Sequence, residues 1–221
     1  MLKTNLKKTI FPIIFFLAIL SLAGCVDTSI KNINSRGKNI ICFGDSFTLG
    51  YGVEKGKDYP YILSKMFSVP VINAGIEGDV TVQALKRLDS DVLEKNPLLV
   101  VVEFGGNDFL SRVPLAETVK NMEEIIKRLQ SRGVMVAVFD MSTDVVMSVY
   151  GKPYRELCKR YGAIFIPAVL EGIIIEPTLK SDFIHPNAAG YKIIAHRVYR
   201  AILPYINRNL IMKKFQEEIL K

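Results

Sequence analysis

Histidine and cysteine are scarce in this sequence, and their scarcity excludes several kinds of site. The 221 residues include two histidines and three cysteines. No group of histidines, cysteines and carboxylates has the spacing of metal ligands, so we expect no metal ion and no cofactor. The chain also lacks the Gly-Lys-Ser/Thr sequence of a P-loop, which argues against a phosphate-binding function.

Internal repeats and low-complexity tracts are also absent. Hydrophobic residues make up 49% of the chain, too many for a disordered protein. A chain of 221 residues has room for one α/β domain and a short extra segment. The formal net charge is +7, but part of it lies in the N-terminal leader, and the other basic residues form no nucleic-acid-binding motif. We therefore expect no nucleic-acid partner.

The N-terminus has the three parts of a secretory signal. A basic stretch, Met1 to Lys8, precedes an apolar run, Ile10 to Leu20, and Leu22-Ala23-Gly24-Cys25 follows. This last sequence resembles the bacterial lipobox, which implies a signal peptide over 1–24 and a lipid on Cys25. An uncleaved membrane anchor is the alternative, although the apolar run is short for a span. Both alternatives predict an exported, membrane-anchored bacterial protein facing the periplasm or the cell exterior.

The segment 25–38 would then carry the lipid and a polar tether, since Asp27 to Lys38 shows no hydrophobic periodicity. Two cysteines remain, Cys42 and Cys158. Both lie in apolar predicted elements, where a buried free thiol is more common than a disulfide. We assign neither cysteine to catalysis.

Strands alternate with helices through the rest of the chain. This order predicts an α/β fold, a doubly wound parallel sheet of five strands in a three-layer α/β/α arrangement. The strongest strand is a continuous apolar run, as expected for a strand covered on both faces. The predicted strands are 39–43, 69–72, 98–104, 134–139 and 163–166, and the predicted helices are 59–67, 81–93, 115–132, 153–161 and 188–202.

A segment with helical periodicity follows the domain, which we assign to 39–206. In this extension, 207–221, the residues Ile211, Phe215 and Ile219 fall on one helical face. The extension could pack on the domain, lie on a membrane or bind a partner, and packing is the default expectation.

The first predicted strand ends in Gly44-Asp45-Ser46. Ligands bind at the carboxyl ends of strands in such sheets, and a serine there can be a nucleophile if a base lies within reach. His185 is the better candidate base, because Asp182, three residues earlier, could fix its tautomer. His196 lies within a predicted helix and is expected to be a surface or structural residue. Taken singly, each of these residues could also belong to an ordinary turn.

Acyl transfer further requires hydrogen-bond donors for a developing oxyanion. The candidate donors are the backbone N–H of Ser46, the N–H of Gly78 and the side-chain amide of Asn107. Gly78 and Asn107 lie in glycine-rich loops after the second and third strands, so all three donors are expected at one end of the sheet.

These blocks resemble the SGNH/GDSL hydrolase superfamily. The matching blocks are 44–52, 73–79, 105–108 and 182–187, and the likeness is closest to bacterial arylesterases, thioesterase I and lysophospholipase L1. The resemblance implies a flavodoxin-like sheet, hydrolysis of esters or thioesters without a metal, and the triad Ser46, Asp182 and His185. It also implies Gly78 as the oxyanion glycine, with Gly75 as the alternative. We interpret Glu103, a carboxylate in an apolar strand, as a structural residue that supports the site loops.

The substrate is less defined by the sequence. Two apolar stretches, 145–150 and 173–175, could wall a groove for an acyl chain or could simply be core residues. Acyl esters or lysophospholipids are the expected substrates. Acetylated cell-envelope carbohydrates are one alternative, and an inactive binding or scaffold lipoprotein is another, although an inactive protein would be expected to have lost one of the triad residues.

Overall fold

The computed structural model describes residues 30–143 and 147–220. The predicted signal peptide and Cys25 lie outside the described residues. Five parallel strands form one sheet in the order β2-β1-β3-β4-β5. The strands are β1 (Asn39–Gly44), β2 (Val71–Gly75), β3 (Pro97–Glu103), β4 (Met135–Phe139) and β5 (Ile164–Ile166).

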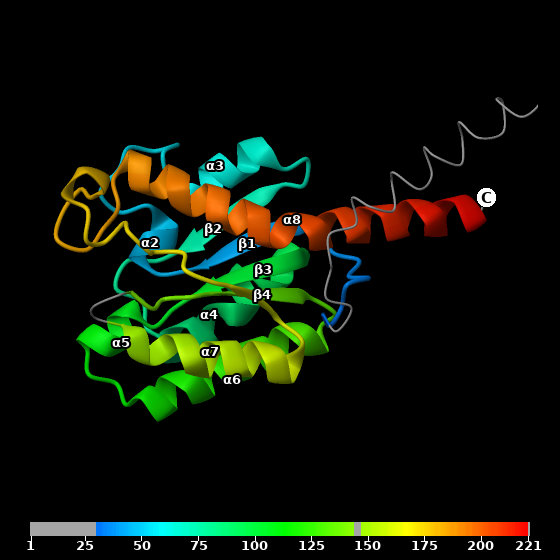
Figure 1. Ribbon diagram of the computed structural model, residues 1–221. Helices are drawn as coiled ribbons and strands as arrows, with labels where there is room; N and C mark the ends of the chain where they lie inside the picture. Colours follow the sequence, from blue (N-terminus) through cyan, green and yellow to red (C-terminus); the bar gives the residue numbers. More distant parts are fainter. Residues whose placement is uncertain (1–29, 144–146, 221) are drawn as a thin grey trace, which may run out of the picture.

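Helices cover both faces of this sheet (Figure 1). Helices α3 (Tyr59–Met66) and α8 (Ala188–Ile219) pack together on one face, while α4 (Thr81–Asp91), α6 (Leu115–Ser131) and α7 (Ser148–Tyr161) cover the other. Two short helices, α2 (Ser46–Leu49) and α5 (Gly106–Leu110), follow β1 and β3. The short 3₁₀ turns are η1 (Leu93–Lys95) and η2 (Pro177–Leu179). The predicted three-layer α/β fold is confirmed, and its strand order is that of flavodoxin.

The core explains why the strands read as apolar runs. All seven residues of β3 and all five of β4 are buried, because helices lie on both faces of the sheet. Cys42 and Cys158 are buried free thiols, as predicted. Burial raises the pKa of both thiols, which keeps them protonated and unreactive.

Apart from the last helix, the second strand and α7 differ most from their predicted bounds. The second strand covers Val71–Gly75 instead of 69–72, because Asn73, Ala74 and Gly75 continue the pairing with the end of β1. Helix α7 begins at Ser148, five residues before its predicted start at Pro153, and it accommodates that proline.

The last helix differs most from the prediction. It was expected to end near residue 202, but α8 continues through Pro204 to Ile219. The default expectation that the extension packs on the domain is wrong for its apolar face, since Ile211, Phe215 and Ile219 are 54%, 61% and 82% exposed. Within 30–143 and 147–220, no helix has the length and apolar character that crossing a bilayer requires.

Candidate active site

Ser46 lies at the carboxyl end of β1. The strand ends at Gly44, and Ser46 is the first residue of α2. Asp45 begins this helix by accepting a hydrogen bond from the Phe47 N–H at 3.0 Å. The serine is 6% exposed, so its hydroxyl is held by the surrounding side chains.

His185 reaches Ser46 from a loop 139 residues later in the chain. Its Nε2 lies 3.0 Å from Ser46 Oγ, and its Nδ1 lies 2.7 Å from Asp182 Oδ2. The other Asp182 oxygen accepts the backbone N–H groups of Ile184 and His185. Desolvation raises the pKa of Asp182, but these hydrogen bonds outweigh it and hold the pKa below its usual value. The structure therefore brings the three predicted residues into one hydrogen-bonded chain.

Two aromatic residues hold the imidazole in place. The rings of Phe47 and Tyr51 lie 5.6 and 4.4 Å from the His185 ring, centroid to centroid. The Tyr51 carbonyl in turn accepts a hydrogen bond from the Tyr191 hydroxyl on α8. These aromatic contacts could not be predicted from the sequence, because only the fold brings α2 and the turn after it beside the loop of His185.

Asn107, on α5, lies beside the turn that carries Ser46. Its side-chain amide donates to Asp45 Oδ2 at 2.9 Å and to the carbonyl of Asp79 at 3.1 Å. Asn107 thus joins the serine turn to the loop that carries Gly78. Both of its amide hydrogens are engaged in this structure, so donation to a substrate oxygen requires one contact to be shared or exchanged.

The two candidate glycines occupy different environments. The Gly75 N–H donates to Asn73 Oδ1, and a Cβ on Gly75 would lie 2.1 Å from the backbone nitrogen of Leu49. Gly75 is therefore required for close packing of β2 against α2. Gly78 has φ +74°, a left-handed conformation, and open space surrounds the position of its missing Cβ. In the described part of the chain, no acceptor is found for the N–H of Gly78 or of Ser46.

Behind the serine, Asp45 and Glu103 form a buried pair of carboxyl groups. Glu103 is fully buried, and its Oε2 accepts the Asp45 N–H at 3.1 Å and the Thr48 hydroxyl at 2.8 Å. Its Oε1 is buried without a hydrogen-bond donor. Burial raises the pKa of Asp45 to about 7 and that of Glu103 well above its usual range.

These contacts assign the proton of the pair. Asp45 accepts hydrogen bonds from Phe47 and Asn107, which stabilise its anionic form. An ionised Glu103 would leave one buried oxygen without a partner, whereas a protonated Glu103 can donate to Asp45. Burial and the unpaired oxygen both favour the neutral form of Glu103, whose Oε2 holds the backbone of Asp45, consistent with its interpretation as a supporting residue.

An apolar cavity of about 380 Å³ opens beside Ser46. The sequence analysis identified part of its wall: Ile174 and Ile175 line it, and so does Met147. Ile173 is buried in the core instead of lining the cavity, and Val145 and Val146 lie outside the described residues. The apolar lining is completed by Phe47, Phe109, Leu110, Phe183 and Ile184.

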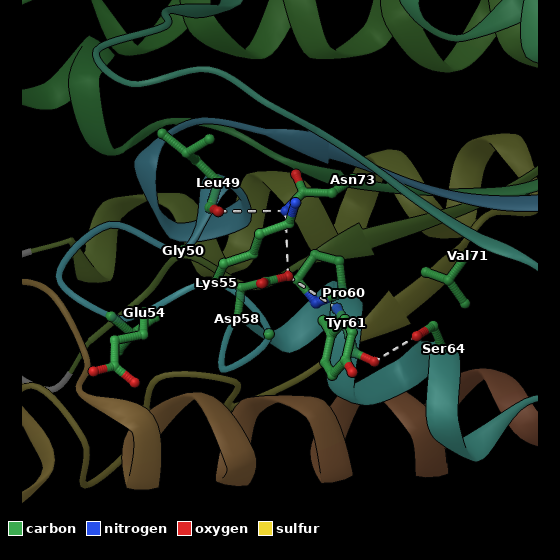
Figure 2. Close-up of a pocket in the computed structure, with 12 residues that line it drawn as sticks. Leu49, Gly50, Glu54, Lys55, Asp58, Pro60, Tyr61, Ser64, Val71 and Asn73 are labelled. Carbon is green, nitrogen blue, oxygen red and sulfur yellow. Dashed lines mark hydrogen bonds between the residues drawn. The ribbon is translucent and has the colours of Figure 1, made fainter.

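A second cavity, of about 370 Å³, lies beyond the other end of α2 and contains none of the candidate catalytic residues. Figure 2 shows that Asn73 and Asp58 in its lining bind each other and the backbone. Asn73 donates to the Leu49 carbonyl and to Asp58, and Asp58 accepts the Tyr61 N–H at the start of α3. These contacts hold the turn after α2.

The remaining sequence candidates lie elsewhere. His196 is exposed on α8, as expected for a surface residue. No cluster of three or more potential metal ligands is found within 30–143 and 147–220.

Comparison with known proteins places this geometry in a family. The model of the GDSL-like lipase/acylhydrolase family matches residues 42–193. Esterase TesA of Pseudomonas aeruginosa is 26% identical over 85% of this chain and 98% of its own length. Thioesterase 1/protease 1/lysophospholipase L1 of Escherichia coli K12 is 24% identical over 93% of this chain and 97% of its own length.

Solved structures show the same fold. The crystal structure of TesA covers 76% of this chain and 99% of its own, with a TM-score of 0.71 and 24% sequence identity. The family match, residues 42–193, includes the serine turn, the loops after β2 and β3, and the loop of His185. The chain therefore belongs to the GDSL-like lipase/acylhydrolase family and is a hydrolase that acts on ester bonds.

Proposed function

We propose that the protein is a serine esterase that hydrolyses carboxylic esters or thioesters of apolar acyl chains, such as those of lysophospholipids. The observation that carries this proposal is the chain of hydrogen bonds from Ser46 through His185 to Asp182, at the edge of an apolar cavity. The cavity has the size and lining of an acyl-chain pocket.

In the proposed reaction, His185 Nε2 accepts the proton of Ser46 as Oγ attacks the carbonyl carbon. Asp182 stabilises the imidazolium that forms. The N–H groups of Ser46 and Gly78 and the side chain of Asn107 stabilise the oxyanion. His185 then gives its proton to the leaving alcohol or thiol, and a water molecule, activated by the same histidine, hydrolyses the acyl-enzyme.

For Asn107, we propose that the oxyanion takes over or shares the longer of its two contacts, the 3.1 Å bond to the Asp79 carbonyl. The shorter contact with Asp45 would keep the amide oriented, and the carboxyl pair with Glu103 would keep Asp45 in place.

The test is the hydrolysis of p-nitrophenyl esters from acetyl to palmitoyl by the protein and by its Ser46→Ala variant. We expect serine-dependent turnover with a maximum at medium or long chains. Activity confined to acetate would favour the alternative, an O-acetyl esterase of cell-envelope carbohydrates. Absence of serine-dependent turnover on every chain length would favour an inactive binding lipoprotein.

We further propose that the mature protein is a lipoprotein anchored through Cys25 after removal of residues 1–24. The sequence Leu22-Ala23-Gly24-Cys25 after a basic and then apolar stretch supports this proposal. Mass spectrometry of the protein purified from membranes tests it: we expect an N-terminal peptide that begins at Cys25 and carries acyl chains.

A further inference from the structure

The described chain begins at the end of the sheet opposite to Ser46. The Lys31 N–H donates to the Gly162 carbonyl before β5, at 2.8 Å, and the Lys38 N–H donates to Asn96 before β3, at 2.9 Å. The Asn32 side chain binds the Val134 carbonyl before β4, at 3.0 Å. Residues 30–38 thus run along the amino ends of the strands, whereas Ser46 follows the carboxyl end of β1.

The exposed tail of α8 lies at this same amino end. The Asn209 side chain donates to the Ser35 carbonyl at 2.9 Å, and Lys213 Nζ donates to the Gly37 carbonyl at 2.8 Å. Beyond Lys213 the helix extends past the sheet (Figure 1), and every described residue from Lys214 onward is exposed. Its apolar side chains, Phe215 and Ile219 among them, have no surface of the domain to pack on.

Exposed basic residues gather at the amino end of the sheet. They belong to the first described segment and to the last residues before β3, β4 and β5. A hollow of about 390 Å³ between them is lined by Arg36 and Arg132. The exposed acids here are Glu94 at this end and Glu217 and Glu218 on the tail, and the exposed basic side chains outnumber them. The exposed basic residues include Lys31, Arg36, Lys38, Lys95, Arg132 and Arg160.

The length of chain before Ile30 limits where a lipid on Cys25 can lie. Ile30 lies five positions after Cys25 in the sequence, and five fully extended steps span at most about 18 Å. Strand β1 alone, with six residues, is about 20 Å long. A lipid on Cys25 therefore reaches a bilayer at the amino end of the sheet but cannot reach around the domain to the mouth of the cavity.

We propose that the amino end of the sheet, together with the tail of α8, rests on a bilayer with anionic headgroups, and that the active site faces away from it. The apolar face of Ile211, Phe215 and Ile219 enters the interface, and the basic residues meet the headgroups. This orientation rests on the proposed lipidation of Cys25. It also narrows the proposed function: the ester groups come from the side away from the anchoring bilayer, as soluble esters or lipid monomers rather than as lipids embedded in that bilayer.

The absence of tryptophan provides a clean test, because the chain contains none. Mature lipidated protein, which begins at Cys25 and carries either Phe215→Trp on the tail or Phe183→Trp at the cavity mouth, is reconstituted into vesicles of phosphatidylcholine and phosphatidylglycerol. The vesicles contain lipids with brominated acyl chains, which quench tryptophan at the interface. We expect strong quenching for Phe215→Trp and little for Phe183→Trp.

Every other result overturns the proposal. Quenching of Phe183→Trp alone means that the active site faces the bilayer, and quenching of both means that the protein lies on its side. Quenching of neither, or a Cys25 without lipid, removes the proposed contact. Ester hydrolysis by the Phe215→Trp protein is measured in parallel, since its absence would count against the proposed function without changing the fluorescence result.

Discussion

Asn107 connects three parts of the candidate site, and this makes it the most informative single residue beyond the triad. It binds Asp45 beside the nucleophile and the Asp79 carbonyl beside Gly78. We predict that Asn107→Ala lowers kcat by about 10²- to 10³-fold, the usual loss for one oxyanion donor. The measurement is steady-state hydrolysis of a p-nitrophenyl ester, with Asn34→Ala, an exposed asparagine at the other end of the sheet, as the control. A loss below tenfold would mean that the side chain does not bind the oxyanion.

If Glu103 supports the nucleophile as a neutral acid, its replacement by glutamine and by alanine should affect stability differently. Glutamine keeps the acceptor for the Asp45 N–H and the Thr48 hydroxyl and adds a donor, so Glu103→Gln should retain the fold and most of kcat. Glu103→Ala leaves two buried donors unpaired and should reduce the free energy of unfolding by about 2–4 kcal/mol. Urea denaturation of both variants measures this difference. Equal destabilisation by glutamine and alanine would show that the charged form of Glu103 is required.

The same carboxyl pair predicts how stability depends on pH. Burial raises the pKa of Asp45 to about 7, from 3.8, and that of Glu103 well above 4.5. The folded protein therefore holds protons that the unfolded chain releases, so this stabilisation is complete below the unfolded pKa values and is lost progressively as the pH rises from there through the folded pKa values, which for Asp45 is about 7. We expect Tm to fall over that range, and to fall less in Glu103→Gln. The exposed Glu171→Gln serves as the control, and a Tm that rises with pH through this range would contradict the assignment.

At the residue scale, the contacts between residues that are close in the sequence could be predicted from their spacing. Asp182 and His185 lie three residues apart in one turn, so their contact follows from the chain itself. The motif blocks also pointed to Ser46, Gly78 and Asn107. Phe47, Tyr51 and most of the cavity wall were not identified, because their place in the site depends on helix and loop packing across distant parts of the chain.

At the scale of elements, α8 fastens the N-terminal segment to the domain. Asn209 is fully buried, and its amide donates to the carbonyls of Ile33 and Ser35. We predict that Asn209→Ala lowers the free energy of unfolding by about 1–3 kcal/mol, since two buried acceptors lose their donor. Deletion of residues 214–221, most of which are exposed, should leave Tm unchanged. Thermal denaturation compares the two, and a large loss on deletion would show that the tail packs on the domain.

The boundaries of the helices and strands could be predicted from apolar periodicity only in part. Apolar periodicity located β1, β3 and α6 closely, because their burial is nearly continuous or strictly helical. It placed the end of β2 too early, since Asn73 and Gly75 are poor strand formers that the pairing with β1 keeps in the sheet. It also ended α8 too early, because a proline normally marks a boundary, whereas Pro204 lies inside this helix.

At the scale of the whole molecule, the cavity beside Ser46 predicts the acyl-chain preference. Ile174 lines this cavity and comes from the loop before η2. Replacing it with tryptophan should fill part of the space, so we predict that the ratio of kcat/KM for octanoyl over acetyl esters falls about tenfold or more in Ile174→Trp. Ile211→Trp, on the exposed face of α8, is the matched control. An unchanged ratio would mean that the acyl chain binds elsewhere.

Covalent labelling tests whether Ser46 is the nucleophile activated by His185. A fluorophosphonate forms a bond between phosphorus and an activated serine oxygen, with loss of fluoride, and the labelled peptide is then identified by mass spectrometry. We expect a single adduct on Ser46, formed at least about 10²-fold more slowly in His185→Ala, because the general base is then missing. An adduct on another residue, or ester hydrolysis that persists while Ser46 remains unlabelled, would contradict it.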